Sequence, residues 1–522
     1  MTGRVLRTWL RFVGHLMGLE LFNKVSRPRL FQKLSSEEFD LLIIGGGITG
    51  AAIFRDAALR GMKVALLEAS DFASGTSGRS SKLIHGGLRY LKHFNFRLTW
   101  EACHERNLHL RLNKHLVRPQ PFLMPLYLDS GVSAITFRLG MWLYEIMSGL
   151  KNRRFHRFLS REETLLMAPG LKEDGLRGGV LLHDAIVSDT RLTLETVKDA
   201  VRHGGIAINH APVTGFLKNN DKISGVICCD QLSHGVYEAR ARVVVNAAGA
   251  WADRIRTLDK DDVSKLVRLS RGTHLVFDGA DVPLTVSTVL FSPFDRRPLF
   301  LIKREGYFLF GTTDDWDEAE PEAPIPVNHD VEYLITSLKE YLPDSRIDRN
   351  KVRFIYSGFR TLPGSEAKSD PSSVTRDDLI EVSASGLITV IGGKLTTARI
   401  MAKRALKHVL RQSGNPGRWS PCRTHKVPIG SAGEEISEGP GQELLQVRSQ
   451  LENACGSEMA CTLEDLVERR FDSLHWSNEE RLKHLHQFKD AICNELGIND
   501  PEFEEEYAAY RQYLKKFHAL PP

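Results

Sequence analysis

The stretch FDLLIIGGGITGAAIFRDAALRGMKVALLE, residues 39–68, decides the fold of this chain. Residues 39–44 are a short apolar run that ends at three glycines, a pattern that predicts a buried strand. The following residues repeat with helical periodicity as far as Gly61, and glycine commonly ends a helix. Residues 63–68 predict a second buried strand. A strand, a helix and a strand at this spacing form one βαβ unit, whose two strands are parallel.

Three glycines and one acidic residue in this unit match what a dinucleotide requires. Gly45, Gly47 and Gly50 form a GxGxxG pattern between strand and helix, and Glu68 ends the second strand. The first glycine permits a tight turn, the second lets the backbone approach a pyrophosphate, and the third lets the helix pack on the sheet. The helix N-terminus then faces the pyrophosphate, and the carboxylate can accept hydrogen bonds from ribose hydroxyls. The unit therefore predicts a bound FAD or NAD.

Two later segments favour FAD over NAD. VVVNAAGAWAD, residues 243–253, is an apolar strand that ends in small residues, as a chain passing close to a bound flavin requires. VIGGKLTTAR, residues 390–399, repeats the order of strand, glycines and helix. A helix N-terminus at that place can stabilise negative charge on a flavin ring as the ring is reduced.

The composition sets the class of protein. The chain has 522 residues, of which 42% are hydrophobic and 26% are charged, so it has the make-up and length of a globular protein with two or three domains. Its net charge of +5 is small for this length and predicts no nucleic-acid partner. Its seven cysteines form no CxxC pair, which argues against a disulfide framework and a zinc site. We therefore expect no metal and a reducing compartment.

The N-terminal residues 1–36 form a basic extension in which Arg4, Arg7 and Arg11 alternate with apolar residues. Three interpretations stay open: an amphipathic helix on a membrane surface, a helix packed on the protein's own body, and a transit peptide. No run in the sequence reaches the ~18 apolar residues of a membrane-spanning helix.

The C-terminal part is predicted to be a helical tail. A segment rich in Gly, Ser and Glu begins at about Glu434 and indicates a linker. Within the tail, Ser477 with Glu480 predicts a capping box. Asp500 followed by Pro501 predicts an N-cap with proline in the first helical turn.

Five further motifs carry a resemblance to a known family. They are DFASGTSGRSSKLIHGGLRYL (71–91), RPLFLIKREGYFLFGTTDD (297–315), YSGFRTLPG (356–364), SSVTRDD (372–378) and VIGGKLTTAR. With the nucleotide unit, they make the region from about Phe39 to about Leu406 resemble the FAD-dependent glycerol-3-phosphate dehydrogenases of the respiratory type, within the D-amino-acid-oxidase-like flavoproteins. The segment TLEDLVERR in the tail is similar to the helical C-terminal domain of that family.

The resemblance implies an α/β fold class with three parts: an FAD-binding Rossmann-like domain of the GR2, or D-amino-acid-oxidase, type, a mixed α/β substrate domain and a helical C-terminal domain. We expect the oxidoreductase to span 37–433, with FAD-binding segments at about 37–125, 180–255 and 350–410 and the substrate domain between them. The helical domain is expected at 434–522.

The implied reaction is the oxidation of sn-glycerol 3-phosphate to dihydroxyacetone phosphate by hydride transfer to flavin N5. The electrons then pass to membrane quinone. The resemblance and the basic extension together predict a cytoplasmic protein held peripherally on the inner face of the cell membrane, for which a homodimer is possible.

Substrate-binding residues are implied where the motifs match the family. They are Arg89, Tyr90, Thr313, Arg360, Arg376 and Lys394. A phosphate monoester carries up to two negative charges, and planar arginines bind it in bidentate fashion. Four cations from distant segments, all in glycine- or turn-rich surroundings, favour an anion pocket over separate surface charges.

Hydride transfer also needs a base that removes the hydroxyl proton. His85 is the first candidate because imidazole titrates near neutral pH, and His274 is the alternative, although either can equally be a structural histidine. Arg360 is expected to assist by placing positive charge beside the alcohol. The predicted cofactor contacts are Gly45, Gly47, Gly50, Glu68, Thr76, Ser77, Ser81, Lys82, Leu83, Gly86, Gly87, Ala248, Gly249, Gly393, Leu395 and Thr396.

Three other functions stay open. A glycerol-3-phosphate oxidase would pass its electrons to O2, and the motifs around the flavin hardly separate it from a dehydrogenase. A flavoprotein that oxidises an amino acid or another hydroxy compound would need a carboxylate clamp with fewer cations. A non-catalytic FAD-binding sensor would be expected to lack Arg360 or Lys394, and both are present.

Overall fold

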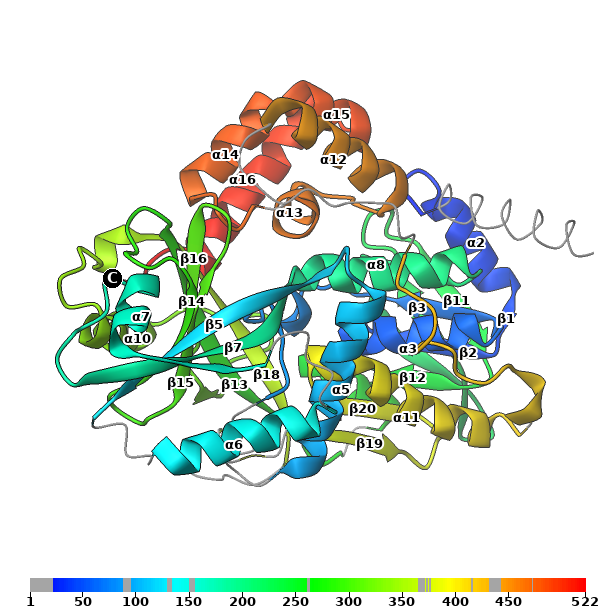
Figure 1. Cartoon of the computed structure of the whole chain (residues 1–522). Coiled ribbons are helices and arrows are strands. Elements are labelled where there is room, and N and C mark those ends of the chain that lie inside the picture. The colour runs from blue at the N-terminus through cyan, green and yellow to red at the C-terminus, as the bar shows by residue number, and fades with distance from the viewer. Residues whose placement is uncertain are drawn as a thin grey trace, which may run out of the picture.

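The computed structural model describes residues 22–87, 95–128, 134–149, 155–260, 263–364, 371, 374, 377–414, 416–430, 443–471 and 473–522. Three parts can be followed in Figure 1: an α/β body that contains α3 and β2, a large mixed sheet around β5 and β7, and a group of C-terminal helices that lies across both. The nucleotide-binding glycines lie in the α/β body.

The α/β body is built on a six-stranded sheet in the order β19-β20-β12-β2-β3-β8. Its strands are β2 (Leu41–Ile44), β3 (Val64–Leu67), β8 (Ile206–Ile208), β12 (Val244–Asn246), β19 (Asp378–Val382) and β20 (Ile388–Gly392). All neighbours pair in parallel except the edge pair of β19 and β20. The predicted βαβ unit is confirmed, because β2 and β3 pair in parallel across α3 (Ile48–Leu59).

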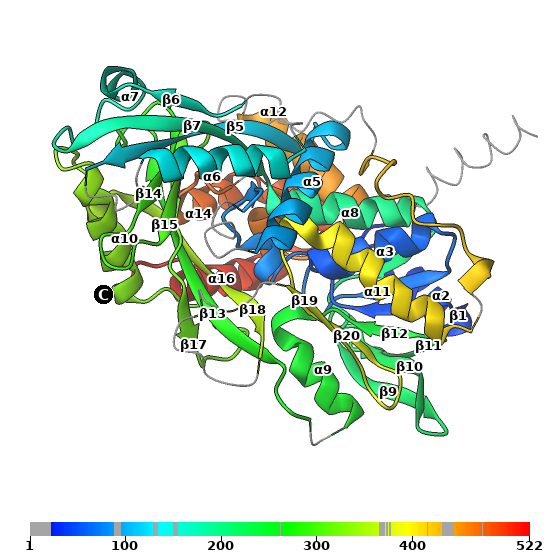
Figure 2. The same ribbon diagram turned by 60° about the horizontal axis from the view of Figure 1, so that its bottom comes forward.

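Helices and a second sheet enclose this sheet (Figure 2). On one face, α3 packs between α8 (Asp189–Arg202) and α11 (Ala398–Gln412). The other face is covered by a four-stranded sheet of β1 (Glu38–Phe39), β9 (Val213–Asn219), β10 (Lys222–Cys229) and β11 (Val236–Ala241). Buried residues of all these elements form one apolar core, which fixes the sheet whose strand ends carry the glycine motifs.

The large sheet forms the second part and has the order β17-β13-β16-β15-β14-β5-β7-β4, with β18 beside β13 and β6 beside β7. Its strands are β4 (Leu83–Ile84), β5 (Val117–Tyr127), β6 (Arg157–Leu159), β7 (Leu176–Val187), β13 (Val267–Asp278), β14 (Ser287–Phe291), β15 (Pro298–Lys303), β16 (Tyr307–Gly311), β17 (Asp315–Asp317) and β18 (Val352–Pro363). The helices that accompany it are α5 (Phe96–Leu112), α6 (Ala134–Met147), α7 (Arg161–Met167) and α10 (Asn328–Tyr341), whereas α9 (Ala252–Asp259) packs on β9 and β20 of the α/β body. Antiparallel pairing of β13 with β18 sets Ser270 opposite Arg360 and His274 opposite Tyr356.

The C-terminal helices have an apolar core of their own. They are α12 (Glu443–Ser457), α13 (Leu463–Asp465), α14 (Asn478–Gln487), α15 (Lys489–Leu496) and α16 (Asp500–Phe517), with a π-helical turn at Leu466–Arg470. The capping box of Ser477 and Glu480 is confirmed at the start of α14. The prediction for α16 was wrong by one residue: Asn499 is the N-cap, because its side chain accepts the backbone N–H of Glu502.

Part of the N-terminal extension packs on the protein's own body. Helix α2 (Arg27–Ser36) buries Arg27, Leu30, Phe31 and Leu34. The Arg27 guanidinium forms a buried ion pair of 2.5 Å with Asp230, beside β10. Residues 1–21 lie outside the described residues, so the other interpretations of that segment stay predictions. Within the described ranges, none of the helices combines the length and the apolar character needed to cross a membrane.

A buried charge network joins the C-terminal helices to the loop after β3. The carboxylate of Asp71 is fully buried and forms ion pairs with Arg469 at 2.5 Å and Arg470 at 2.7 Å. Burial alone would raise the pKa of Asp71, but the two guanidinium groups outweigh it and hold that pKa below its usual value of 3.8. Since the pKa is lowered on folding, the stabilisation is complete at neutral pH and is lost only in acid.

We expect Asp71→Asn to lower the free energy of unfolding by about 3–5 kcal/mol, because it breaks the buried ion pairs with both arginines and leaves Arg470 with only the Glu458 carboxylate, 3.9 Å away. Urea denaturation followed by circular dichroism measures this change. Glu452→Gln is the matched control, since it removes the partner of Arg448 from an exposed pair that contributes little. Equal, small changes in both variants would show that the Asp71 network does not hold the helices in place.

Candidate active site

The turn after β2 leaves no room for side chains. A Cβ on Gly45 would lie 2.6 Å from the carbonyl oxygen of Ala247, and the φ of Gly45 is +108°, a conformation that favours glycine. A Cβ on Gly50 would overlap the carbonyl oxygen of Gly45. Glycine at 50 therefore lets α3 pack directly on the turn, and glycine at 45 lets the turn lie against the end of β12.

Two side chains bind backbone amides at this turn. Glu68 accepts the N–H of Gly46 at 2.6 Å and the N–H of Ser70 at 2.8 Å. The hydroxyl of Ser77 accepts the N–H of Ile48, the first residue of α3, at 2.8 Å. Gly47 is the N-cap of the helix, and a Cβ there would lie 3.1 Å from the Ser77 oxygen. A carboxylate and a helix N-terminus stand where a ribose and a pyrophosphate need them, so these residues fit FAD.

Two further turns lie at the same edge of the sheet. Ala248 and Gly249 follow β12, and Gly393, Lys394, Leu395 and Thr396 follow β20. Because parallel strands end at one edge, both turns lie beside Gly45, at the place where open α/β sheets bind their ligands. The hydroxyl of Thr396 accepts the N–H of His85 at 3.3 Å, which ties the second turn to the segment before residue 88.

The segment 76–82 connects the α/β body to the large sheet. The hydroxyl of Thr76 donates to the carbonyl oxygen of Phe359 in β18 at 2.6 Å. The hydroxyl of Ser81 lies 2.8 Å from Nε2 of His274 in β13. Segment 76–82, which contains four of the predicted FAD contacts, therefore lies against the strand pair that carries Arg360 and His274.

The guanidinium of Arg360 lies over a glycine of the neighbouring strand. A Cβ on Gly272 would lie 2.5 Å from one of its nitrogens, so glycine there makes room for the group. Arg360 donates to the Asp314 carboxylate at 3.1 Å and to the Thr312 hydroxyl at 3.1 Å. Thr313 is buried, and its hydroxyl accepts the N–H of Thr273 at 3.0 Å.

His274 is buried between this cation and an aromatic ring. Its imidazole stacks on the Tyr356 ring with centroids 4.8 Å apart and planes 14° from parallel. Burial lowers the pKa of His274 well below 6.5, and the charges of Arg360 and Lys82 lower it further. The imidazole is therefore neutral at pH 7, the form in which it can accept a proton. His85, by contrast, is half-buried, and its ring centroid lies 6.4 Å from that of Phe300.

Several predicted cofactor residues are used by the protein itself. The Lys82 ammonium forms a buried ion pair of 2.5 Å with Asp189 at the start of α8. Leu83 is buried in β4. Gly86 is packed so closely that a Cβ there would lie 2.6 Å from the sulfur of Cys103. Gly87 has a φ of +73°. Arg89, Tyr90 and Arg376 lie outside the described residues.

Sequence reasoning did not single out Tyr356, Gly272 or Asp314, although each contacts a predicted site residue. Strand periodicity could have found the first, because Tyr356, Gly358 and Arg360 alternate in YSGFR and so share a face of β18. Asp314 directly follows Thr313 in FGTTDD, but no local pattern shows that it pairs with a cation 46 residues away.

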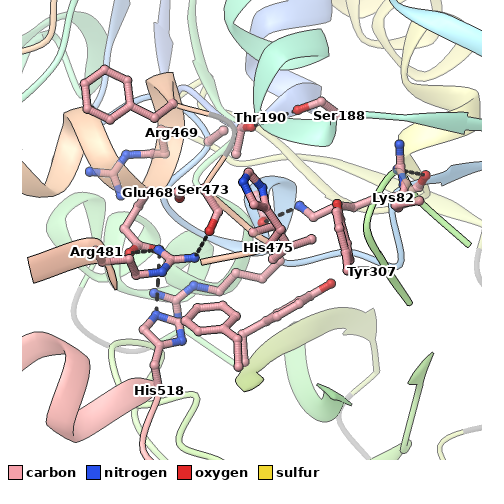
Figure 3. Close-up of a pocket in the computed structure, with 18 of the residues that line it drawn as sticks. Lys82, Ser188, Thr190, Tyr307, Glu468, Arg469, Ser473, His475, Arg481 and His518 are labelled. Atoms are coloured by element: carbon pink, nitrogen blue, oxygen red, sulfur yellow. Dashed lines mark hydrogen bonds and ion pairs between the residues drawn. The ribbon is translucent and has the colours of Figure 1, made fainter. Parts of the chain in front are cut away.

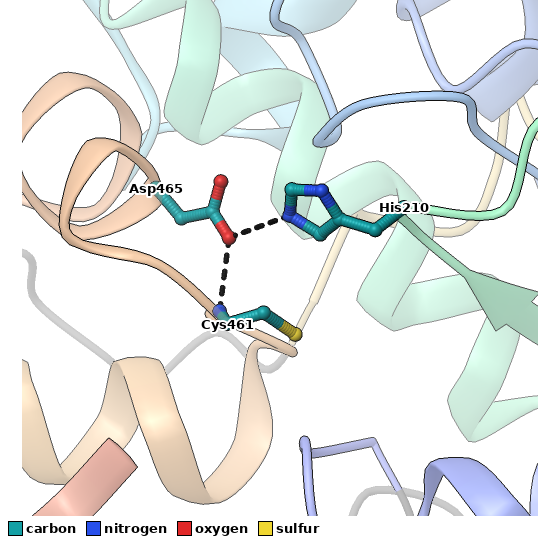
Figure 4. A group of neighbouring side chains, drawn as sticks. All are labelled: His210, Cys461 and Asp465. Atoms are coloured by element: carbon teal, nitrogen blue, oxygen red, sulfur yellow. Dashed lines mark hydrogen bonds and ion pairs between the residues drawn. The ribbon is translucent and has the colours of Figure 1, made fainter. Parts of the chain in front are cut away.

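A histidine, a cysteine and an aspartate gather at the junction with the C-terminal helices (Figure 4). His210, Cys461 and Asp465 each place a potential metal-ligating atom within 4.8 Å of the others. One oxygen of Asp465 accepts hydrogen bonds from His210 Nε2 at 2.9 Å and the Cys461 N–H at 2.9 Å. Burial raises the pKa of the Cys461 thiol, and the Arg27 guanidinium lies 4.0 Å from its sulfur. These contacts describe an ion pair that docks the C-terminal helices.

Comparison with known proteins identifies the class. The FAD dependent oxidoreductase family matches residues 40–403. The chain therefore belongs to the family of FAD-dependent oxidoreductases, and the predicted fold class and cofactor are confirmed.

Its relatives narrow this class further. The aerobic glycerol-3-phosphate dehydrogenase of Bacillus subtilis (strain 168) is 38% identical over 411 residues, which cover 78% of this chain and 74% of the relative. The protein of that name from Staphylococcus haemolyticus (strain JCSC1435) is 34% identical over 466 residues, which cover 89% of this chain and 82% of the relative. Within the family the chain groups with the aerobic glycerol-3-phosphate dehydrogenases, as predicted.

The solved structures agree. The glycerol-3-phosphate dehydrogenase from Bacillus halodurans complexed with FAD has a TM-score of 0.76 and 27% identity, over 95% of this chain and 98% of that one. The L-alpha-glycerophosphate oxidase from Mycoplasma pneumoniae shares the fold, with a TM-score of 0.55 and 18% identity over 72% of this chain and 95% of that one.

We expect Gly50→Ala to be purified with little bound FAD, because its methyl group must push α3 away from the turn that receives the pyrophosphate. Flavin absorbance per protein measures the loss. Gly456→Ala is the control, since that glycine lies in α12 with open space around its Cβ position. Full flavin content in Gly50→Ala would mean that the turn does not form the FAD site.

Proposed function

We propose that this protein oxidises sn-glycerol 3-phosphate to dihydroxyacetone phosphate and passes the electrons to membrane quinone. The observation that carries the proposal is the placement of a partly exposed guanidinium, Arg360, and a neutral buried imidazole, His274, on one face of the β13–β18 pair beside segment 76–82. The relatives named above point to the same substrate.

Arg360 suits the binding of the substrate phosphate. Asp314 and Thr312 fix its guanidinium from one side, while a fifth of the side chain stays exposed. A fixed guanidinium binds a phosphate in bidentate fashion and loses little conformational entropy on binding. Lys394, half-buried in the turn after β20, is proposed as a second cation of the pocket, with Arg89, Tyr90, Thr313 and Arg376 as further contacts.

The substrate loses a proton from its C2 hydroxyl and a hydride from C2, and bound FAD supplies the hydride acceptor. We assign the proton to His274 rather than to His85, because His274 is buried beside Arg360 and its hydrogen bond to Ser81 orients the ring. The dianionic phosphate offsets the positive charge that lowers the pKa of His274. Substrate binding therefore makes this imidazole a stronger base.

An exposed apolar surface supports attachment to a membrane. On α6, Trp142 is 53% exposed and Ile146 is 59% exposed, and the ring of Phe155, itself 49% exposed, lies 6.5 Å from that of Trp142. Exposed tryptophan and phenylalanine are typical of surfaces that dip into a lipid headgroup layer. Such contact would hold the protein at the inner face of the cell membrane, where quinone resides. A homodimer stays a prediction.

An anaerobic visible spectrum tests the reaction. We expect the flavin band of the purified protein to bleach on addition of sn-glycerol 3-phosphate, and Arg360→Met to need at least about tenfold more substrate for the same effect, since a charge-assisted hydrogen bond is lost. A band that stays oxidised would overturn the substrate assignment and favour another hydroxy or amino compound. Faster reoxidation by O2 than by quinone would favour the oxidase alternative.

Replacing each candidate base in turn tests which histidine accepts the proton. We expect His274→Asn to lower the rate of flavin reduction by a factor of about 10² to 10⁴, as for loss of a general base, and His85→Asn to lower it much less. In the unchanged protein, kcat/KM should fall only well below pH 6.5, since a base acts when it is neutral and the pKa of His274 is lowered. The corresponding fall in kcat should occur at higher pH, because kcat reports the pKa of His274 in the substrate complex. A larger loss in His85→Asn would assign the proton to His85.

A further inference from the structure

A cleft lies behind the active site, where the α/β body, the large sheet and the C-terminal helices meet (Figure 3). It is open to solvent on one side, and all three parts of the molecule contribute residues to its walls. Its walls carry aromatic rings from two of the three parts, among them Tyr307, Phe354 and Tyr513. None of the functions argued above uses this cleft.

The guanidinium of Arg79 lies in the wall of the cleft. Arg79 is half-buried, donates a hydrogen bond to the Tyr513 hydroxyl at 2.9 Å and lies over the Phe517 ring at 5.5 Å. In the described part of the chain, no carboxylate pairs with it. Lys82 and Arg481, which also line the cleft, are paired with Asp189 and Glu468. Arg79 therefore offers a positive charge that a ligand can neutralise.

The start of a long helix faces the same space. Ser188 and Thr190, at the first turn of the 14-residue helix α8, line the cleft, and their hydroxyl oxygens lie 3.3 Å apart. Ser188 is the N-cap, but its side chain makes no capping hydrogen bond. Two hydroxyl donors at the positive end of a helix suit an anion, and Arg79 adds a guanidinium to them.

A buried imidazole, His518, lies in the cleft wall beside the carboxylate of Glu468. His518 is 5% exposed, and burial lowers its pKa to about 4, so the ring is neutral at pH 7. Nδ1 must carry the proton, because it donates to the carbonyl oxygen of Ile355 at 2.7 Å. Nε2 is then an acceptor that lies 3.7 Å from Glu468 Oε2, and neither that carboxylate nor another described residue donates a hydrogen bond to it. A hydroxyl group of a ligand would satisfy it.

From these groups we infer that the cleft is a second binding site, which takes a small organic phosphate that carries hydroxyl groups. Arg79 and the hydroxyls of Ser188 and Thr190 receive the phosphate, Nε2 of His518 accepts from a hydroxyl, and the aromatic walls cover the carbon skeleton. Figure 3 shows Ser188, Thr190, His475 and His518 around this space.

A single residue, Tyr356, lies between the cleft and the proposed base His274. Tyr356 lines the cleft, stacks on His274, and donates from its hydroxyl to the carbonyl oxygen of Ser80 at 2.8 Å. Ser80 lies between Arg79 and Ser81, whose hydroxyl contacts His274. A ligand that draws Arg79 into the cleft therefore acts on the segment that orients the proposed base.

Isothermal titration of the FAD-loaded protein with D-ribose 5-phosphate tests the site without any readout of activity. We expect saturable binding that weakens about tenfold or more in Arg79→Gln, which loses a charge-assisted contact, and severalfold in Ser188→Ala. Arg448→Gln, the same change on an exposed helix, should leave binding unchanged. Arg360→Met should also leave it unchanged, because that residue belongs to the active site.

Two results would overturn the proposal. The first is the absence of binding at millimolar D-ribose 5-phosphate. The second is binding that is lost in Arg360→Met and retained in Arg79→Gln, which would place the ligand in the active site. Ser188→Ala keeps the test valid if Arg79→Gln is unstable, since the Ser188 hydroxyl contacts only that of Thr190 in the described structure.

Discussion

The buried carboxylate of Asp71 is the contact on which the arrangement of the three parts depends. It follows β3 by four residues, close to the Glu68 carboxylate that binds the turn of the nucleotide site. Two guanidinium groups from the C-terminal helices neutralise it. Burial of Asp71 costs free energy that its ion pairs with the two arginines offset, so the contact forms only when the C-terminal helices pack on the nucleotide loop. The same helices then form one wall of the cleft behind the active site.

The segment 76–82 is the mechanical link between the two sites. Its hydroxyls contact the nucleotide turn through Ser77 and the proposed base through Ser81. Arg79 and Lys82, from the same segment, line the cleft. A ligand that moves Arg79 would therefore act on the same segment that contacts the nucleotide turn and His274.

Local patterns predicted the nucleotide unit well, because the strands, the helix and the glycine turn all lie within residues 39–68. They failed where the partner comes from far along the chain. No local pattern shows that the ammonium of Lys82, a predicted cofactor contact, pairs with Asp189, 107 residues later. The need for glycine at 86 comes from Cys103 and Tyr144, which pack on it from α5 and α6. The N-cap of α16 shifted from Asp500 to Asn499 because the two side chains have similar capping strength.

Charge balance explains how the proposed active site keeps its base neutral without losing its affinity for an anion. Asp314 holds Arg360 and Asp189 holds Lys82, so both cations are partly compensated before any substrate arrives. Burial is the main cause of the lowered pKa of His274, and the remaining positive field of the two cations lowers that pKa further. A substrate phosphate carries up to two negative charges. It would bind to the two cations and at the same time reduce the positive field that opposes protonation of His274. Binding and activation of the base are then one electrostatic event, and a compound without the phosphate would lack both.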